Sequence, residues 1–181
     1  VCVGCEALKN TQKNDVLVTL GIKPTRPDTG YGYIQFEEGT VHRDIHKVKT
    51  FTEKPDYELA RTFIKSGDFL WNSGIFIWNV KSIMSAFDHF QQDIHQAFWA
   101  ARKVFNTKDE KRMLEKAYSI CPSISIDYAI MERADNVFVI PAAFGWSDLG
   151  TWASLWDNYN KDYYGNAVKG DNVMIYDAAN N

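Results

Sequence analysis

The order in which strand-like and helix-like segments follow one another constrains the fold most. Short runs rich in β-branched and aromatic residues alternate with longer segments whose apolar residues recur at helical spacing. This alternation predicts an α/β fold. Strands are expected over residues 16–20, 31–36, 41–51, 69–78, 137–140 and 173–176. Helices are expected between Asp56 and Gly67, over 81–90, 94–105 and 109–118, after Ser125 and after Thr151.

Composition and charge exclude several classes of function. Of the 181 residues, 45% are hydrophobic and 24% are charged, the usual balance of a soluble globular protein. The net charge of −3 gives no basic excess, so a nucleic-acid partner is not expected. No apolar run approaches the roughly 20 residues that a membrane helix needs, and residues 1–10 show no signal-peptide pattern.

The cysteines and histidines give no pattern of a metal or redox site. Cys2 and Cys5 form a lone C-x-x-C on an expected first helix, and Cys121 stands far from them. We interpret all three as ordinary thiols in a reducing cytoplasm. His42 and His46 share a face of an expected strand, where two histidines alone indicate surface residues.

A charged turn follows the third expected strand. Glu53 and Lys54 stand just before Pro55 and the helix that Asp56 caps. A carboxylate can accept hydrogen bonds from two sugar hydroxyls, and an ammonium can hold a phosphate. A straight strand would point the two side chains to opposite faces, so they can serve one ligand only if the chain bends. On the pattern alone, a solvated turn explains both residues.

Polar residues interrupt the strand expected over residues 69–78. Alternation places Asn72 and Gly74 on one face, and a glycine inside a strand often marks the close approach of a ligand or of another backbone. An amide both donates and accepts hydrogen bonds, so Asn72 could read hydroxyl groups. A β-bulge with a structurally bonded asparagine explains the same pattern equally well.

Three further residues are candidates on weaker grounds. Asp148 lies in a glycine-bounded turn before a helix, where a carboxylate can bind Mg²⁺ or can simply brace the turn. Gly32 follows Tyr31 in a glycine-containing stretch that could bring backbone N–H groups near a ligand or form an ordinary turn. Asp127 opens a short helix, where its charge favours the helix dipole and requires no other role.

The order of these segments resembles that of the mannose-1-phosphate guanylyltransferases. The matching segments, in the expected order, are 19–34, 51–56 (Phe-Thr-Glu-Lys-Pro-Asp), 71–74 (Trp-Asn-Ser-Gly), 125–132 and 146–152. The resemblance covers nearly the whole chain from Val16 onward. It implies a partial Rossmann-like, glycosyltransferase-A-like nucleotidyltransferase domain with a mixed sheet over residues 1–164. Residues 165–181 would begin a left-handed β-helix-like domain.

The resemblance also implies a reaction and roles for individual residues. Mannose 1-phosphate would attack the α-phosphorus of GTP, with Mg²⁺ present, to give GDP-mannose and pyrophosphate. The substrate-binding positions would be Gly32, Glu53, Lys54, Asn72, Asp127 and Tyr128. Lys54 and Asp148 would act in catalysis, with Asp148 as a metal ligand.

One departure from the family pattern limits what this chain is expected to do. The family has a G-x-G-x-R loop and an early metal-binding carboxylate, and neither pattern occurs in the sequence. The nucleotide-binding half is therefore expected to be missing and the chain alone to be inactive, and a homo-oligomer would hide the exposed sheet edge. A related transferase with another sugar or base, and a non-catalytic sugar-phosphate-binding or regulatory module, remain as alternatives.

Overall fold

The structure, a computed structural model, describes residues 15–39 and 45–181. These residues divide into two compact units, the first ending at Ala143 and the second spanning Phe144–Asn181. This division reflects the packing within each unit. It does not test the boundary predicted at residue 164, between the nucleotidyltransferase domain and the β-helix-like domain, and that boundary stays a prediction.

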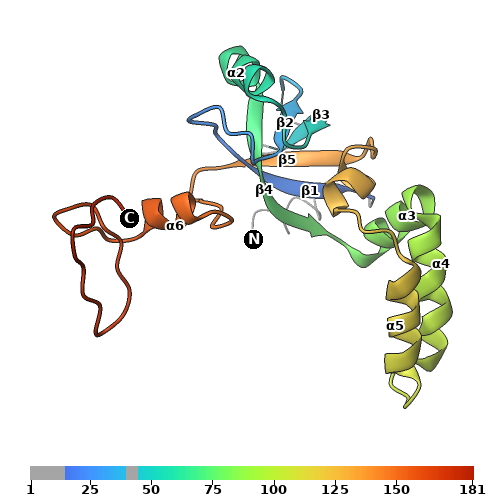
Figure 1. Ribbon diagram of the computed structural model, residues 1–181. Coiled ribbons are helices and arrows are strands. Elements are labelled where there is room, and N and C mark those ends of the chain that lie inside the picture. The colour runs from blue at the N-terminus through green and yellow to red at the C-terminus, as the bar shows by residue number, and fades with distance from the viewer. Residues whose placement is uncertain (1–14, 40–44) are drawn as a thin grey trace. The chain divides into compact units, whose positions relative to one another are not determined.

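Five strands in the first unit form one mixed sheet whose pairings close into a barrel, in the order β1-β4-β2-β3-β5 (Figure 1). The strands are β1 (Leu17–Ile22), β2 (Tyr33–Phe36), β3 (His46–Thr52), β4 (Phe69–Trp78) and β5 (Val137–Ala142). Strands β1 and β5 run parallel, and the other neighbours are antiparallel. The predicted α/β class and mixed sheet are confirmed.

Strand β1 is buried along its whole length in this barrel. All six of its residues are buried, and it pairs with β4 on one side and with β5 on the other. Its alternate side chains enter two apolar clusters, with Leu17 in one and Val18 and Leu20 in the other. A nearly continuous apolar run is what a strand covered on both faces requires.

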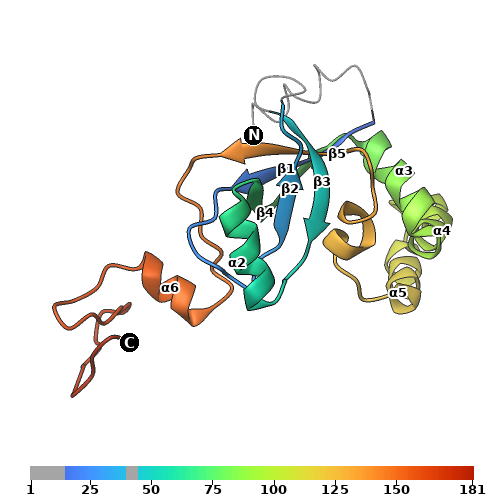
Figure 2. The ribbon, with the colours of Figure 1, turned by 90° about the horizontal axis from the view of Figure 1, so that it is seen from above.

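The helices of the first unit gather in two places. Helix α2 (Tyr57–Ser66) packs near β2 and β4, with the Phe63 ring 5.4 Å from that of Tyr33 and 4.0 Å from that of Phe69 (Figure 2). Helices α3 (Val80–Phe90), α4 (Gln92–Ala101) and α5 (Glu110–Ile120) form a separate group that the same view shows side by side. The remaining elements are the 3₁₀ turn η1 (Arg102–Val104), the π turn η2 (Asp127–Met131) and α6 (Trp152–Asn158).

The predicted helix ends are confirmed where capping residues mark them. Asp56 Oδ1 accepts a 2.8 Å hydrogen bond from Leu59 N at the start of α2, and Gly67 ends that helix with a left-handed φ of 83°. In the second unit, Thr151 caps α6 and exchanges hydrogen bonds with Ser154.

Other predicted elements differ from the structure. The strand predicted over residues 173–176 is wrong, since Met174 is 97% and Tyr176 is 90% exposed and no strand forms there. A four-residue apolar run without a neighbouring strand to share its hydrogen bonds is not stable as a strand. The helix expected after Ser125 is a π turn, and α4 ends at Ala101 rather than at residue 105. The expected first helix with Cys2 and Cys5, and His42, lie outside the described residues.

The larger apolar cluster holds the π turn η2 against the sheet. Ala129, Ile130 and Met131 are all buried in this cluster, beside Leu70 of β4 and Ala86 of α3. The middle of η2 is thus anchored in the core, and this anchoring fixes the positions of the polar residues at both of its ends.

Candidate functional site

The chain bends sharply where β3 ends. Lys54 follows Glu53 with a φ of 46°, in the left-handed region that residues with a side chain adopt only rarely. The Lys54 Nζ atom lies 3.7 Å from Glu53 Oε1, so the bend brings both charged groups to one place. The Glu53 side chain is 11% exposed and that of Lys54 is 61% exposed. The bend that the sequence required for a shared site is therefore present.

Gly32 lies where the backbone of one segment meets side chains from two others. Its carbonyl accepts a 2.7 Å hydrogen bond from Asn72 N. A Cβ atom at Gly32 would collide with the Glu53 carboxylate and would stand 3.3 Å from Asn72 Cβ. Glycine at this position is what lets Glu53 and Asn72 approach each other.

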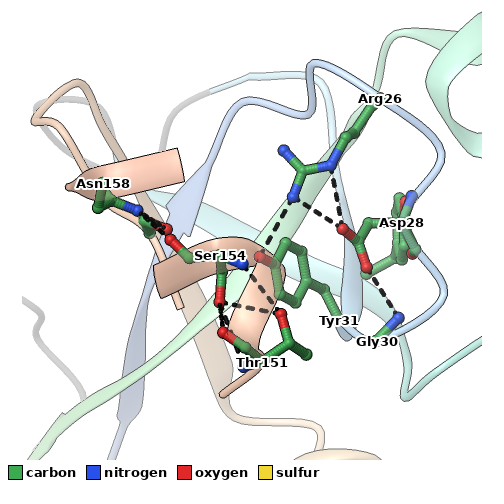
Figure 3. Close-up of polar contacts among 9 residues, drawn as sticks. Arg26, Asp28, Gly30, Tyr31, Thr151, Ser154 and Asn158 are labelled. Atoms are coloured by element: carbon green, nitrogen blue, oxygen red, sulfur yellow. Dashed lines mark hydrogen bonds and ion pairs between the residues drawn. The ribbon is translucent and has the colours of Figure 1, made fainter. Parts of the chain in front are cut away.

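The loop before Gly32 is braced by its own polar contacts (Figure 3). Arg26 forms an ion pair of 2.9 Å with Asp28, whose other oxygen accepts a hydrogen bond from Gly30 N. The Tyr31 ring meets the Trp71 ring edge-on at 5.0 Å, which attaches this loop to β4 immediately before Asn72.

The amide of Asn72 is held in one orientation by three hydrogen bonds. Its Oδ1 accepts from Thr19 Oγ1 and from Gly74 N, both at 3.2 Å, and its Nδ2 donates to Asp127 Oδ1 at 2.9 Å. Gly74 has a φ of 70° and lies in a bulge of β4, so the simple alternation expected there is broken. The predicted bulge with a bonded asparagine is therefore confirmed, and the reading of hydroxyl groups by Asn72 stays a prediction.

This orientation changes what Asn72 can offer to a ligand. Two donors already occupy its oxygen, and one of its two Nδ2 hydrogens is used by Asp127. The hydrogen bonds of the described residues leave one N–H, so Asn72 is set up as a donor and not as both donor and acceptor. The carboxylates of Glu53 and Asp127 supply acceptors beside it.

Burial and neighbouring charges shift the pKa of the Glu53 carboxyl group. Burial raises its pKa above the ordinary value of 4.5, the carboxylate of Asp127 raises it further, Lys54 lowers it, and Glu132 raises it. The net effect is a raised pKa, because two neighbouring carboxylates and partial burial outweigh one exposed ammonium. Glu53, Lys54, Asp127 and Glu132 therefore share one electrostatic neighbourhood.

Sequence reasoning missed two hydrogen-bond partners of these site residues, Glu132 and Thr19. Glu132 Oε1 accepts a 3.1 Å hydrogen bond from Glu53 N, across 79 positions of the chain, and Thr19 reaches Asn72 across 53 positions. Glu132 stood inside a recognised segment, yet an acidic residue at a helix end carries no sign of a distant partner. Thr19 stood in a buried strand, and its burial as a polar residue was the only available signal.

Tyr128 is the one predicted substrate-binding residue of the first unit that stays apart from this hydrogen-bond network. Its ring is 42% exposed, and its N–H donates a long 3.5 Å hydrogen bond to Ser125 Oγ. Within the described part of the chain, no hydrogen bond joins Tyr128 to Glu53, Asn72 or Asp127.

Asp148 belongs to the second unit, Phe144–Asn181. Its Oδ1 accepts a 3.1 Å hydrogen bond from Gly150 N, just before the Thr151–Ser154 capping contacts that Figure 3 shows. This contact braces the turn, as the structural interpretation of Asp148 expected, and leaves the carboxylate exposed. Over residues 15–39 and 45–181, no three His, Cys, Asp or Glu side chains gather as metal ligands would.

A large open hollow of the first unit does not coincide with this chemistry. An open hollow of about 860 Å³ is lined by α5 and the residues before it, from Thr107 to Ser119. A smaller one of about 290 Å³ includes Glu132 beside residues of β3. Convergent polar groups, and not the size of a hollow, therefore define the candidate site as Gly32, Glu53, Lys54, Asn72 and Asp127, here called the polar cluster.

The mixed α/β sheet and the polar cluster agree with one class of protein, the nucleotidyl transferases. The chain belongs to the nucleotidyl transferase family, whose model matches residues 5–164. No helix of the described residues is both long and apolar enough to cross a membrane.

Individual relatives have more specific names than the family has. The chain is 43% identical over 159 residues to mannose-1-phosphate guanylyltransferase RfbM of Salmonella typhimurium, covering 87% of this chain and 33% of that protein. It is 43% identical over 157 residues to the mannose-1-phosphate guanylyltransferase of Sinorhizobium fredii, covering 86% of this chain and 30% of that one. The chain spans about a third of the length of these relatives.

A solved structure supports the same fold. The crystal structure of mannose-1-phosphate geranyltransferase from Thermus thermophilus matches with a TM-score of 0.72 and 30% identity, over 90% of this chain and 45% of that one. The nucleotidyltransferase-like α/β fold is thus common to this chain and a solved relative.

Proposed function

We propose that this chain serves in the transfer of a guanylyl group from GTP to mannose 1-phosphate, which gives GDP-mannose and pyrophosphate. One observation carries the proposal: Gly32, Glu53, Asn72 and Asp127 come from four separate segments and meet through contacts and hydrogen bonds. The names of the relatives supply the substrate class.

The polar cluster suits a sugar phosphate. The Glu53 carboxylate would accept hydrogen bonds from sugar hydroxyls, and the remaining N–H of Asn72 would donate to a hydroxyl oxygen. The exposed ammonium of Lys54 would hold the phosphate as a point charge. Gly32 would let the sugar lie against the backbone, and Tyr128 would contribute from the exposed side.

The reaction needs little from the protein beyond placement and charge. A phosphate oxygen of mannose 1-phosphate attacks the α-phosphorus of GTP, the new P–O bond forms, and the bond to the bridging oxygen breaks as pyrophosphate leaves. Two anions must be brought together, so Lys54 would act by neutralising charge and by orienting the attacking phosphate. No protein nucleophile is required.

Asp148 is proposed as a magnesium ligand because it matches the metal-binding position of the family. A single exposed carboxylate fits the coordination of Mg²⁺, which keeps several waters and is shared with substrate phosphates. When bound, the ion would neutralise charge on the transferring phosphates. The proposal further includes a cytoplasmic location and a homo-oligomer, which cell fractionation and light scattering would test. The exposed sheet edge that an oligomer was expected to hide is absent among the described strands, because their pairings close into a barrel.

Ligand-observed NMR with mannose 1-phosphate and with GTP, in the presence of Mg²⁺, tests the proposal. The unmodified chain is expected to bind mannose 1-phosphate, and Glu53→Ala is expected to abolish detectable binding. Glu58→Ala is the matched control, because Glu58 is an exposed carboxylate on α2 that pairs with Arg61. It is expected to bind as the unmodified chain does.

The outcomes separate the alternatives. Equal binding by Glu53→Ala and the unmodified chain would overturn the site assignment. Preference for another sugar 1-phosphate would favour a related transferase. Binding of mannose 1-phosphate without GTP would agree with the expected absence of the nucleotide half, whereas steady pyrophosphate release by the 181-residue chain would contradict it.

A further inference from the structure

The turn η2 is unusual in its hydrogen bonding. Glu132 N donates to Asp127 O at 2.9 Å, which closes a π turn over five residues. Single π turns are rare and occur frequently at functional sites. The two residues that this hydrogen bond joins are both acidic.

Both ends of η2 reach residues of the polar cluster. Asp127 Oδ1 accepts from Asn72 Nδ2 on β4 at 2.9 Å, and Glu132 Oε1 accepts from Glu53 N at the end of β3 at 3.1 Å. The first contact orients a side chain, and the second fixes the main chain of a turn. One short segment thus sets two groups that are far apart in the sequence.

The π geometry explains how both carboxylates can serve two strands that β2 separates in the sheet. An α-helix advances about 100° per residue, so residues five positions apart would point roughly 140° away from each other. A π turn brings residue i+5 back over residue i, as an α turn does with residue i+4. Asp127 and Glu132 can therefore face Asn72 of β4 and the turn after β3 together.

The segment between the two carboxylates is held firmly. Ala129, Ile130 and Met131 are buried in the main apolar cluster, and Ala129 O accepts a 3.0 Å hydrogen bond from Gln91 Nε2. The carboxylates at the ends of η2 thus extend from an anchored segment, which is what a supporting shell for a binding site requires.

We propose that η2 is the positioning element of the polar cluster and that Glu132 is a positioning residue, which fixes the Glu53 turn for ligand binding without touching the ligand. This inference rests on the proposed function and adds to it a residue outside the recognised site. The requirement is for an acceptor oxygen at position 132, and not for a negative charge there.

Two substitutions at Glu132 separate these requirements. Glu132→Gln keeps an acceptor oxygen and removes the charge, whereas Glu132→Ala removes both. In the absence of ligand, hydrogen exchange at the Glu53 amide, followed by NMR, is expected to become about tenfold faster in Glu132→Ala and to stay near its original rate in Glu132→Gln. Glu115→Ala, on the exposed surface of α5, is the control.

Binding of mannose 1-phosphate gives the second measurement. Glu132→Ala is expected to weaken binding about tenfold and Glu132→Gln to restore it.

Each result decides between explanations. Equal Glu53 exchange in all variants, or loss of binding in Glu132→Gln as large as in Glu132→Ala, would overturn the inference. If the unmodified chain did not bind mannose 1-phosphate, the proposed function would fail, and the exchange measurement would still decide whether Glu132 holds the Glu53 turn.

Discussion

Gly32 shows at the scale of one residue how the site depends on the absence of a side chain. In Gly32→Ala the new methyl group would meet the Glu53 carboxylate and displace it. We expect a loss of about 1–2 kcal/mol in the free energy of unfolding, as overpacking typically causes. Affinity for mannose 1-phosphate should fall at least about tenfold, since the carboxylate moves by more than hydrogen-bond tolerance. Urea unfolding and ligand-observed NMR measure the two effects.

Gly145→Ala is the control for this substitution. A Cβ at Gly145 meets nothing within 4 Å. Unchanged binding in both variants would show that Gly32 does not need to be a glycine for the ligand.

The raised pKa of Glu53 makes a second prediction at the residue scale. Burial, Asp127 and Glu132 hold this pKa above 4.5, against the effect of Lys54. Between 4.5 and the folded-state pKa, the folded chain binds more protons at Glu53 than the unfolded chain does. The contribution of Glu53 to stability is therefore full below pH 4.5 and is lost as the pH rises through the folded-state pKa.

Glu53→Gln removes this titration. The free energy of unfolding of the variant, relative to that of the unmodified chain, should rise as the pH increases above 4.5, as urea unfolding between about pH 4 and pH 7 would show. A difference that stays constant over this range would contradict the prediction.

Sequence reasoning reached part of the site at this scale. It named Glu53, Lys54, Asn72 and Asp127 from recognised segments, and the structure brings them together. It missed Glu132 because the role of that residue depends on a hydrogen bond across 79 positions. Long-range partners of this kind leave no mark in local spacing.

At the scale of elements, the end of α2 tests how local signals set a helix. Gly67 has a φ of 83°, and a Cβ there would meet nothing within 4 Å. Gly67→Ala should therefore cost about 1 kcal/mol in the free energy of unfolding through backbone strain alone. Affinity for mannose 1-phosphate should stay unchanged, because no polar-cluster residue contacts position 67 within the described residues.

Chemical denaturation of Gly67→Ala beside Gly145→Ala measures this cost. Both substitutions add a methyl group in open space, and only the first is in a left-handed conformation. Equal stability of the two variants would count against the strain.

Local signals predicted the capped helix ends well, whereas one of the predicted strands is wrong. Asp56, Gly67 and Thr151 marked their helix boundaries because a cap acts within a few residues of itself. The run Val173–Tyr176 has the composition of a strand, yet a strand also needs a partner, and composition carries no information about one. The π turn at Asp127–Met131 could not be predicted either, since a single hydrogen bond from residue i+5 to residue i leaves no mark in the spacing of apolar residues.

At the scale of the first unit, alternation predicted the α/β class and left the closure of the sheet undetermined. Among the described residues, strands β3 and β5 join through two pairs, His46 with Val139 and Lys47 with Phe138. Strand β1 is paired along its length on both sides. Over residues 15–39 and 45–181, the β3–β5 seam therefore has the fewest residue pairs of the barrel.

Hydrogen exchange should reveal this difference. Amides at the start of β3 are expected to exchange at least about tenfold faster than those of β1, because few contacts must break to open the seam. Exchange followed by mass spectrometry or NMR measures the rates. Uniform protection across both strands would show that the seam opens only with the whole barrel.

The left-handed backbone of Lys54 has a consequence for directed evolution. A lysine in this conformation carries about 1–2 kcal/mol of backbone strain, which glycine would relieve. Glycine would also raise the conformational entropy of the unfolded chain, which lowers the free energy of unfolding by about 0.4–1 kcal/mol. Losing the attraction between Lys54 and Glu53 offsets part of the relieved strain, so Lys54→Gly should fold about as well as the unmodified chain. The variant also lacks the ammonium proposed to hold phosphate. A screen for thermal resistance alone would accept this exchange, so selection of more robust variants of this chain requires a screen for ligand binding in the same round.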